Sequence, residues 1–300
     1  MSMRAAITAG FFLIFTLPLI PVQMLLLRFG HAGLGHTGGR WLPVLYHRGV
    51  AWLLRLKIQV HGRPYRDGPV LFVINHISWL DIVALSTPLP VSFIAKSEVE
   101  TWPFFGLLAR LQRTVFVDRN ARQRTAEHRD EMRERLTAGD NLILFPEGTS
   151  SDGLRVLPFK SAFFATAERP LNGKPLVVQP VSLGYAKLNH MPVGRRWMSM
   201  FAWLGDEDLV PHLWRFLKAG PAEAVIEFHH PVTIEDFTSR KEMAAYCHQV
   251  VIEGLSDINA GRDPGPRSLP KSRLGPEELP ATDETGPDDA GLGGGSEAAA

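Results

Sequence analysis

Residues 70–81 read Val-Leu-Phe-Val-Ile-Asn-His-Ile-Ser-Trp-Leu-Asp, an apolar run of five followed by a polar loop and a second apolar stretch. A short run rich in β-branched and aromatic residues is typical of a strand that is buried on both faces. This strand delivers Asn75 and His76 into a loop, and a helix is expected to begin near Ser78. The stretch therefore predicts a strand–loop–helix unit with polar side chains at the end of the strand.

Short apolar runs of this kind recur along the chain and alternate with helical patterns. Residues 40–60 read as an amphipathic helix that continues into a strand, and the helix lies either at a lipid interface or against the core. Alternation of strands and helices predicts an α/β domain with a mixed, largely parallel sheet flanked by helices. The other expected strands are 92–95, 114–117, 142–145, 176–183 and 224–228, and the other expected helices are 80–85 and 121–137.

His76 and Asp81 are the first candidates for chemistry. Four residues separate them, so a carboxylate on the first helical turn can reach back to a ring nitrogen in the loop. Such a carboxylate fixes the imidazole tautomer and makes the other nitrogen a better general base. An alternative interpretation stays open, because Ser78 and Asp81 also match a capping box that satisfies only backbone N–H groups.

A second loop that is a candidate for catalysis or binding follows the expected strand 142–145. It reads Pro146-Glu147-Gly148-Thr149. The glycine allows the backbone to approach a ligand closely, and Thr149 with neighbouring amides suits phosphate oxygens. Glu147 would bind an acceptor hydroxyl or order nearby basic residues. The alternative is an ordinary turn that contains glycine.

Three cations, Lys96, Arg119 and Lys160, follow core segments. Together they would suit one anion, with Arg119 placed for bidentate phosphate contact, although each taken singly is more often a surface charge. The arginines of residues 121–137 are expected on a solvated helix face instead. These are Arg122, Arg124, Arg129, Arg133 and Arg135.

Taken in order, these segments resemble the four motifs of the glycerolipid acyltransferase superfamily, in particular bacterial 1-acyl-sn-glycerol-3-phosphate acyltransferases. The first motif, Asn-His-x-Ser-x-x-Asp, matches residues 75–81, and the second, of the type Gly-x-Ile-Phe-Ile-x-Arg, matches 113–119. The third, Phe-Pro-Glu-Gly-Thr-Arg-Ser, matches 145–151, and the fourth, a hydrophobic strand around a proline, matches 178–182.

Two departures from these motifs concern the head group of the acceptor. Arg113 stands where glycine is usual, and Ser150 replaces the arginine of the third motif. Both positions are expected beside the phosphate site. Residues 93–99, 145–153 and 202–213 are similar to the branch that contains lyso-ornithine lipid O-acyltransferases, and an ornithine head group would need no phosphate clamp.

The resemblance implies an O-acyltransferase that moves a fatty acyl group from an acyl thioester to the free hydroxyl of a membrane lyso-lipid. The first acceptor it implies is 1-acyl-sn-glycerol-3-phosphate, which becomes phosphatidate, and the alternative is lyso-ornithine lipid. His76, oriented by Asp81, would act as the base without a covalent intermediate. The donor would be a thioester of acyl carrier protein or coenzyme A, with no cofactor and no metal. The implied binding residues are Arg119, Glu147, Gly148 and Thr149, with Lys96 and Lys160 as further cations and Pro180 on the donor side.

Two other classes of function stay open. A lipid hydrolase or thioesterase would use the same pair to activate water, and a lipid-binding protein would hold a lyso-lipid without using His76. The sequence contains no Gly-x-Ser-x-Gly elbow, no Gly-x-x-x-x-Gly-Lys-Ser/Thr loop and no His-Glu-x-x-His helix. These absences argue against an α/β-hydrolase nucleophile, a P-loop and a zinc protease helix.

Residues 5–27 carry no charge and lie between Arg4 and Arg28. At about 1.5 Å per residue they just suffice to cross a hydrocarbon core of about 30 Å, so they predict a membrane anchor. Pro18 and Pro21 favour a helix–break–helix hairpin in one leaflet as the competing geometry, and a cleaved signal peptide is a third possibility. Basic residues after the segment outnumber those before it, which predicts a catalytic domain on the cytoplasmic side of the inner membrane.

Charge and composition set the remaining limits. The chain has 32 Lys and Arg against 31 Asp and Glu, and this net charge of +1 predicts no nucleic-acid partner. A single cysteine, Cys247, excludes intramolecular disulfides and favours a reducing compartment. The last forty residues hold 8 Gly, 6 Pro and no aromatic side chain, so a disordered tail is expected. The expected division is an anchor and interfacial segment at 1–48, an acyltransferase domain at 49–258 and the tail at 259–300.

Overall fold

The computed structural model describes residues 3–29, 34–117, 125–204 and 207–262, together with Gly265 and Arg267. Arg119 therefore lies outside the described residues. The same holds for residues 268–300, which make up most of the expected tail.

One mixed sheet organises the described residues. Its strand order is β1-β8-β6-β2-β5-β3-β4, with β7 paired to β6. All pairs are parallel except β6 with β8 and β6 with β7, which confirms the predicted mixed, largely parallel sheet. The strands are β1 (Leu56–His61), β2 (Val70–Ile74), β3 (Ser92–Lys96), β4 (Val115–Val117), β5 (Leu142–Leu144), β6 (Val177–Leu188), β7 (Met191–Pro192) and β8 (Ala222–Phe228).

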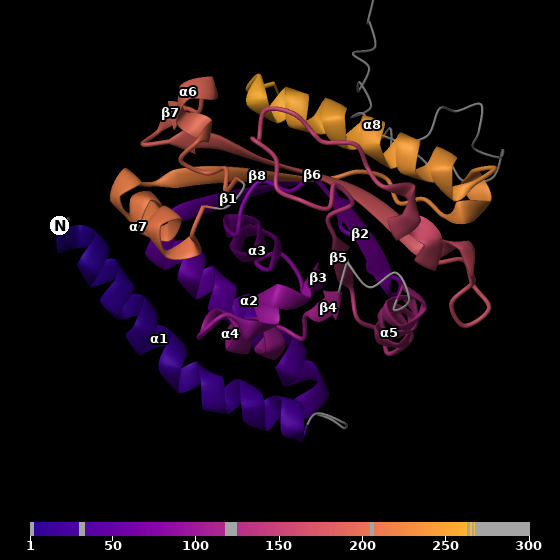
Figure 1. Ribbon diagram of the computed structural model, residues 1–300, viewed down its shortest axis with the longest axis horizontal. Coiled ribbons are helices and arrows are strands. Elements are labelled where there is room, and N and C mark those ends of the chain that lie inside the picture. Colours follow the sequence, from indigo (N-terminus) through magenta and orange to yellow (C-terminus); the bar gives the residue numbers. More distant parts are fainter. Residues whose placement is uncertain are drawn as a thin grey trace, which may run out of the picture. The chain divides into compact units, whose positions relative to one another are not determined.

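Helices cover both faces of this sheet (Figure 1). Helix α8 (Arg240–Asn259) lies along one face, over β6, while α2 (Leu34–Leu54), α3 (Leu80–Leu85) and α7 (Leu209–Ala219) lie on the other. The strands β2 and β5 are buried along their whole length, because helices exclude water from both of their faces. The remaining helices are α1 (Met3–Arg28), α4 (Phe105–Leu111), α5 (Thr125–Thr137) and α6 (Arg195–Met198), with short 3₁₀ turns at Ser97–Thr101, Ser161–Glu168 and Ile234–Asp236.

Helix α1 is unbroken through Pro18 and Pro21, so the helix–break–helix hairpin, the competing geometry for residues 5–27, does not form. Neighbouring helices hold α1 on both sides of the prolines. Thr16 Oγ1 lies 3.1 Å from Tyr46 Oη on α2, and Gln23 Nε2 donates to the carbonyl of Leu111 at 3.0 Å. These side-chain contacts tie α1 to the body along its length, and α1 pairs with α2 instead of folding on itself.

Among the described helices, α1 is the one long and apolar enough to cross a membrane, with a mean hydropathy of 2.1 over 18 residues. Most of this segment is exposed. One side of helix α2 packs against the core, which is one of the two alternatives stated for residues 40–60. Its residues Val50 and Leu54 are buried in the core, whereas Trp41 and Trp52 are 45% and 81% exposed. The domain boundary expected at residue 48 falls inside this helix.

Candidate active site

His76 and Asp81 are in direct contact at the carboxyl end of β2. His76 Nδ1 lies 2.8 Å from Asp81 Oδ2. The Asp81 side chain is completely buried, whereas 21% of the His76 side chain is exposed. With Nδ1 donating to the carboxylate, Nε2 is the nitrogen that can take a proton from a substrate, and no described residue is hydrogen bonded to it. The pair has the geometry of an oriented general base.

Asp81 also accepts hydrogen bonds from backbone N–H groups at the start of α3. Its Oδ2 accepts the backbone N–H of Ile77 at 2.7 Å and that of Ser78 at 3.0 Å. The hydroxyl of Ser78 is buried without a partner among the described residues, so the predicted capping box forms only on the carboxylate side. One carboxylate therefore serves both roles that the sequence left as alternatives, capping the helix and orienting the imidazole.

Parallel pairing brings the loops after β2 and β5 to the same edge of the sheet. Val73 is in register with Leu144, and Phe93 on β3 is in register with Ile143. In an open parallel sheet the carboxyl ends of the strands form the usual ligand edge. His76 lies three residues beyond Val73, and Glu147 lies three residues beyond Leu144. The two residues are therefore at the same level along the strands.

Glu147 holds the backbone of the His76 loop. Its Oε1 accepts the N–H of His76 at 2.6 Å, and its Oε2 accepts the N–H of Leu157 at 2.7 Å. The side chain is 2% exposed and both of its oxygens have backbone partners, so binding of an acceptor hydroxyl by Glu147 stays a prediction. Burial raises the pKa of Glu147 to about 8, and the two N–H donors oppose that rise because they favour the ionised form.

Ser151, which the sequence reasoning did not single out, completes this clamp. Its backbone N–H and its hydroxyl donate to the carbonyl of His76 at 2.7 and 3.0 Å. Glu147 thus binds the backbone N–H of His76, and Ser151 binds its backbone carbonyl. Phe145 stacks on the imidazole with ring centroids 4.1 Å apart, so the loop after β5 fixes His76 through both its backbone and its ring.

Of the two expected cations that the structure describes, Lys96 and Lys160, Lys160 lies nearer to this loop. Its backbone N–H donates to Pro146 at 3.0 Å, and a Cβ added to Gly148 would lie 2.7 Å from its Nζ. Gly148 also has φ +79°, a conformation that side chains rarely adopt. Lys96 ends β3, two strands from β2, which corresponds to about 10 Å across the sheet. Thr149 is exposed beside Gly148.

Pro180 is not brought to this edge. It pairs with Val73 inside the sheet, and its carbonyl accepts the N–H of His229 at 3.1 Å. Three strand positions, or about 10 Å, separate that level from His76. Pro180 therefore shapes the strand in the interior and does not line the exposed edge.

Arg113 also lies elsewhere, and the expectation that it sits beside the phosphate site is wrong. It precedes β4 and therefore lies at the amino edge of the parallel strands, with its guanidinium on Asp140 at 2.8 and 2.9 Å. Its φ of +62° explains why glycine is usual at this position. Ser150 does lie beside the site, and its hydroxyl donates to the carbonyl of Trp203.

Trp203 connects the segment 202–213 to the site. Its backbone N–H donates to Ile77 at 3.0 Å, and its indole packs edge-on against Trp102 with centroids 5.8 Å apart. Local spacing gave no hint of this placement. The segment that resembles the lyso-ornithine branch therefore borders the two loops that carry His76 and Ser150.

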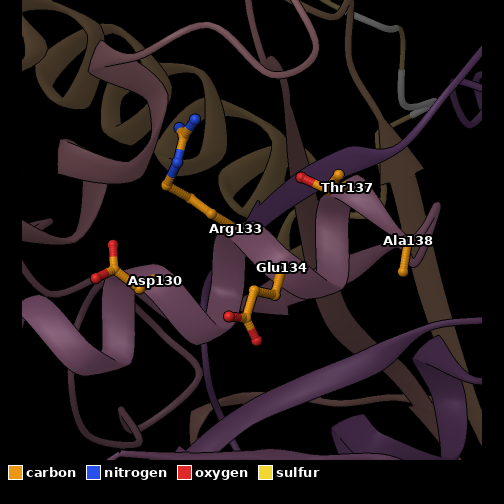
Figure 2. A pocket seen from close by; sticks show the side chains of 5 residues that line it. All are labelled: Asp130, Arg133, Glu134, Thr137 and Ala138. Atoms are coloured by element: carbon orange, nitrogen blue, oxygen red, sulfur yellow. The ribbon is translucent and has the colours of Figure 1, made fainter.

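The arginines expected on a solvated face of α5 are partly engaged. Arg133 donates to the carbonyls of Arg169 and Pro170 at 3.0 and 2.8 Å, and Arg135 binds Asp140 at 2.6 Å. A surface hollow of about 480 Å³ runs along this helix. Figure 2 shows Arg133 and Glu134 projecting from different sides of α5. Its lining residues, Asp130, Arg133, Glu134, Thr137 and Ala138, include none of the candidate site residues.

Comparison with known proteins places these features in a family. The family model described as Acyltransferase matches residues 57–184. The chain is 39% identical to a lyso-ornithine lipid O-acyltransferase of Rhizobium meliloti, over 91% of this chain and 92% of that protein, and 42% identical to one of Brucella abortus, over 83% and 92%. It is 43% identical to a 1-acyl-sn-glycerol-3-phosphate acyltransferase of Neisseria meningitidis, over 40% of this chain and 48% of that protein.

The fold agrees with these matches. The crystal structure of a 1-acyl-sn-glycerophosphate acyltransferase from Thermotoga maritima superposes with a TM-score of 0.61 at 22% identity, covering 86% of this chain and 97% of that one. Its similarity concerns the fold alone, whereas the two lyso-ornithine lipid O-acyltransferases match 91% and 83% of this chain. The chain belongs to the glycerolipid acyltransferase family and is an acyltransferase.

Proposed function

We propose that this acyltransferase acylates the free hydroxyl of lyso-ornithine lipid. The observation that carries the proposal is the extent of the similarity. Relatives named lyso-ornithine lipid O-acyltransferase align with 83% and 91% of the chain, whereas the relative from Neisseria meningitidis aligns with 40%. Ser150 supports the same acceptor, because its hydroxyl is turned to the carbonyl of Trp203 where the third motif usually has a cation.

Lysophosphatidate is the second candidate acceptor, and the sequence motifs alone place it first. The identity of 43% within the aligned part of the Neisseria meningitidis enzyme favours it. Lys160 beside Gly148, Lys96 at the end of β3 and Arg119 are the cations proposed to meet an anionic head group. A single enzyme acting on both acceptors is compatible with this arrangement.

In the proposed mechanism His76 Nε2 takes the proton of the acceptor hydroxyl while that oxygen attacks the carbonyl carbon of the acyl thioester. The C–O bond forms, the C–S bond breaks, and His76 returns the proton to the departing thiolate, so no acyl-enzyme forms. Asp81 keeps Nδ1 protonated and stabilises the transient imidazolium. Membership of an acyltransferase family favours this transfer over a hydrolase or a purely lipid-binding role.

The donor in this proposal is a thioester of acyl carrier protein or of coenzyme A, and no cofactor takes part. Both carriers occur in the cytoplasm, which supports a catalytic domain on the cytoplasmic side of the inner membrane. The clamp made by Glu147 and Ser151 holds His76 in place while both substrates are positioned. Positioning of this kind supplies a large part of the rate enhancement in reactions between two bound molecules.

We further propose that α1 lies in the membrane interface and does not cross the bilayer. Gln23 donates to the carbonyl of Leu111 at the end of α4, and Phe12 packs against Phe104 with centroids 6.2 Å apart, so both halves of α1 rest on the catalytic part. The outer side of α1 exposes Phe11 and Ile14 at 58% and 70%. These exposed apolar side chains of α1, with exposed tryptophans of α2 alongside, suit contact with lipid at the membrane interface.

The proposal is tested by acyl transfer with the full chain in lipid nanodiscs and a labelled acyl donor. Lyso-ornithine lipid and lysophosphatidate are offered separately to the wild type, to His76→Ala and to a control, His230→Ala, in which an exposed histidine is removed. Transfer to lyso-ornithine lipid that falls by about 10² or more in His76→Ala alone is expected. Transfer to lysophosphatidate alone would reassign the acceptor, and transfer independent of His76 would overturn the mechanism.

A further inference from the structure

We propose that Tyr185 is a positioning residue for the His76–Asp81 pair and sets the pH range in which His76 works. The inference rests on the proposed function, since it assumes that His76 is the base. Tyr185 belongs to none of the motifs that identify the family in the sequence. It lies on β6, 104 residues beyond Asp81 in the chain.

The hydroxyl of Tyr185 donates to Asp81 Oδ1 at 2.6 Å. The other carboxylate oxygen, Oδ2, accepts from His76 Nδ1 and from two backbone N–H groups. Among the described residues, Tyr185 is therefore the one partner of Oδ1. Tyr185 and Asp81 are 1% and 0% exposed, so water does not replace this contact.

Packing holds the phenol in this position. The Tyr185 ring stacks on Phe201 with centroids 4.6 Å apart and an angle of 9° between the planes. The pairing of β6 with β8 shifts register between Tyr185 and Lys187. Irregularities of this kind are common beside active sites, where they redirect a side chain. The shift lies directly after the residue that reaches Asp81.

Burial and the charge of Asp81 raise the pKa of Tyr185 well above its usual value. The phenol is therefore neutral at any pH at which the enzyme works, and it donates its single hydrogen to the ionised carboxylate. Glu147, from the loop after β5, is the other titratable group shown to interact with Asp81, whose charge raises the pKa of Glu147 further. His76, Tyr185 and Glu147 thus make up the titratable surroundings of this carboxylate.

Two consequences follow from this contact. The hydroxyl fixes the plane of the carboxylate, so Oδ2 stays directed at the imidazole. It also draws negative charge toward Oδ1, which weakens the hold of Oδ2 on a protonated His76. Without the hydroxyl, Asp81 would stabilise the imidazolium more strongly, and His76 would become a free base only at higher pH.

The test is Tyr185→Phe, which removes the hydroxyl and keeps the ring, with Tyr46→Phe as the matched control. Tyr46 is partly buried and its hydroxyl has its own contact, with Thr16 at 3.1 Å, but it lies on α2. In Tyr185→Phe we expect kcat at pH 7 to fall by about tenfold, the size of one lost hydrogen bond to a charged group. The acidic limb of the kcat/KM profile should move up by about one pH unit. KM for both substrates should change little, the unfolding temperature should fall by only a few degrees, and Tyr46→Phe should leave the profile in place.

A second readout does not depend on acyl transfer. Histidine side-chain NMR of the full chain in nanodiscs, with the His76 signal assigned by its loss in His76→Ala, should show the same upward shift of its titration midpoint in Tyr185→Phe. An unchanged midpoint and an unchanged acidic limb would overturn the inference, and so would a uniform loss of activity at every pH. If His76→Ala remained active while the midpoint still shifted, the proposed function would fail and the contact would stand.

Discussion

Asp81→Asn is expected to abolish most of the activity and leave the fold nearly intact. The amide has the shape of the carboxylate, and its oxygen can still accept from His76 and from the N–H groups of Ile77 and Ser78. Its NH₂ group then faces Tyr185, whose hydroxyl can turn to accept. The substitution therefore removes the negative charge beside His76 and little else.

The magnitude follows from the distance between the two side chains. With Nδ1 and Oδ2 at 2.8 Å, the charge centres of an imidazolium and a carboxylate lie about 4 Å apart. At an effective dielectric constant of about 20, this pair is worth about 4 kcal/mol. If the transition state carries the full imidazolium charge, kcat should fall by about 10³-fold. The free energy of unfolding should fall by only about 1–2 kcal/mol, since the hydrogen bonds persist in weaker form.

The assay compares kcat at saturating donor and acceptor with thermal unfolding followed by circular dichroism. Asp140→Asn is the matched control, because Asp140 is 4% exposed and binds Arg40, Arg113 and Arg135 at the opposite edge of the sheet. This control should lose about 2 kcal/mol of stability and keep its kcat within about twofold. Asp81→Asn retaining more than a tenth of the activity would refute the reasoning, as would an equal loss of kcat in the control.

Two further predictions concern the N-terminal helix pair and a buried carboxylate under α8. Gly49→Val should displace α1, because a Cβ at this position would lie 2.4 Å from the Phe15 ring. Gly10→Val should not displace α1, because a Cβ there has nothing within 4 Å. Limited proteolysis should therefore cut α1 faster in Gly49→Val, and equal rates in the two variants would contradict this. Glu227 is fully buried with no hydrogen-bond partner among the described residues, and burial raises its pKa to about 7. Because the folded value lies above the unfolded one, the stability from this group is present below about pH 4.5 and is lost as the pH rises through 7, by up to about 2.5 kcal/mol between pH 5 and 8. Glu227→Gln should not lose stability between these pH values, and urea unfolding at pH 5 and pH 8 measures the difference. An identical pH dependence of the free energy of unfolding in the wild type and in Glu227→Gln would contradict this prediction.

Several features of this chain can be predicted because the signals are local. The buried strand at residues 70–74 shows in its unbroken apolar run, and the contact of His76 with Asp81 follows from a separation of one helical turn. The glycine usual at the position of Arg113 marks a left-handed backbone, and φ there is +62°. The motifs, read in order, also point to the family without any coordinates.

Other features depend on which strands become neighbours, and the sequence does not encode this locally. Parallel pairing of β2 with β5 places Glu147 and Ser151 on His76, across 71 and 75 residues of chain. Pairing of β6 with β2 brings Tyr185 to Asp81, and strand direction puts Arg113 at the edge away from the site. The sequence by itself determined the contact of His76 with Asp81, since one turn of chain joins them. Only the tertiary structure decided what surrounds them, because those contacts form when distant strands are held in register by the sheet.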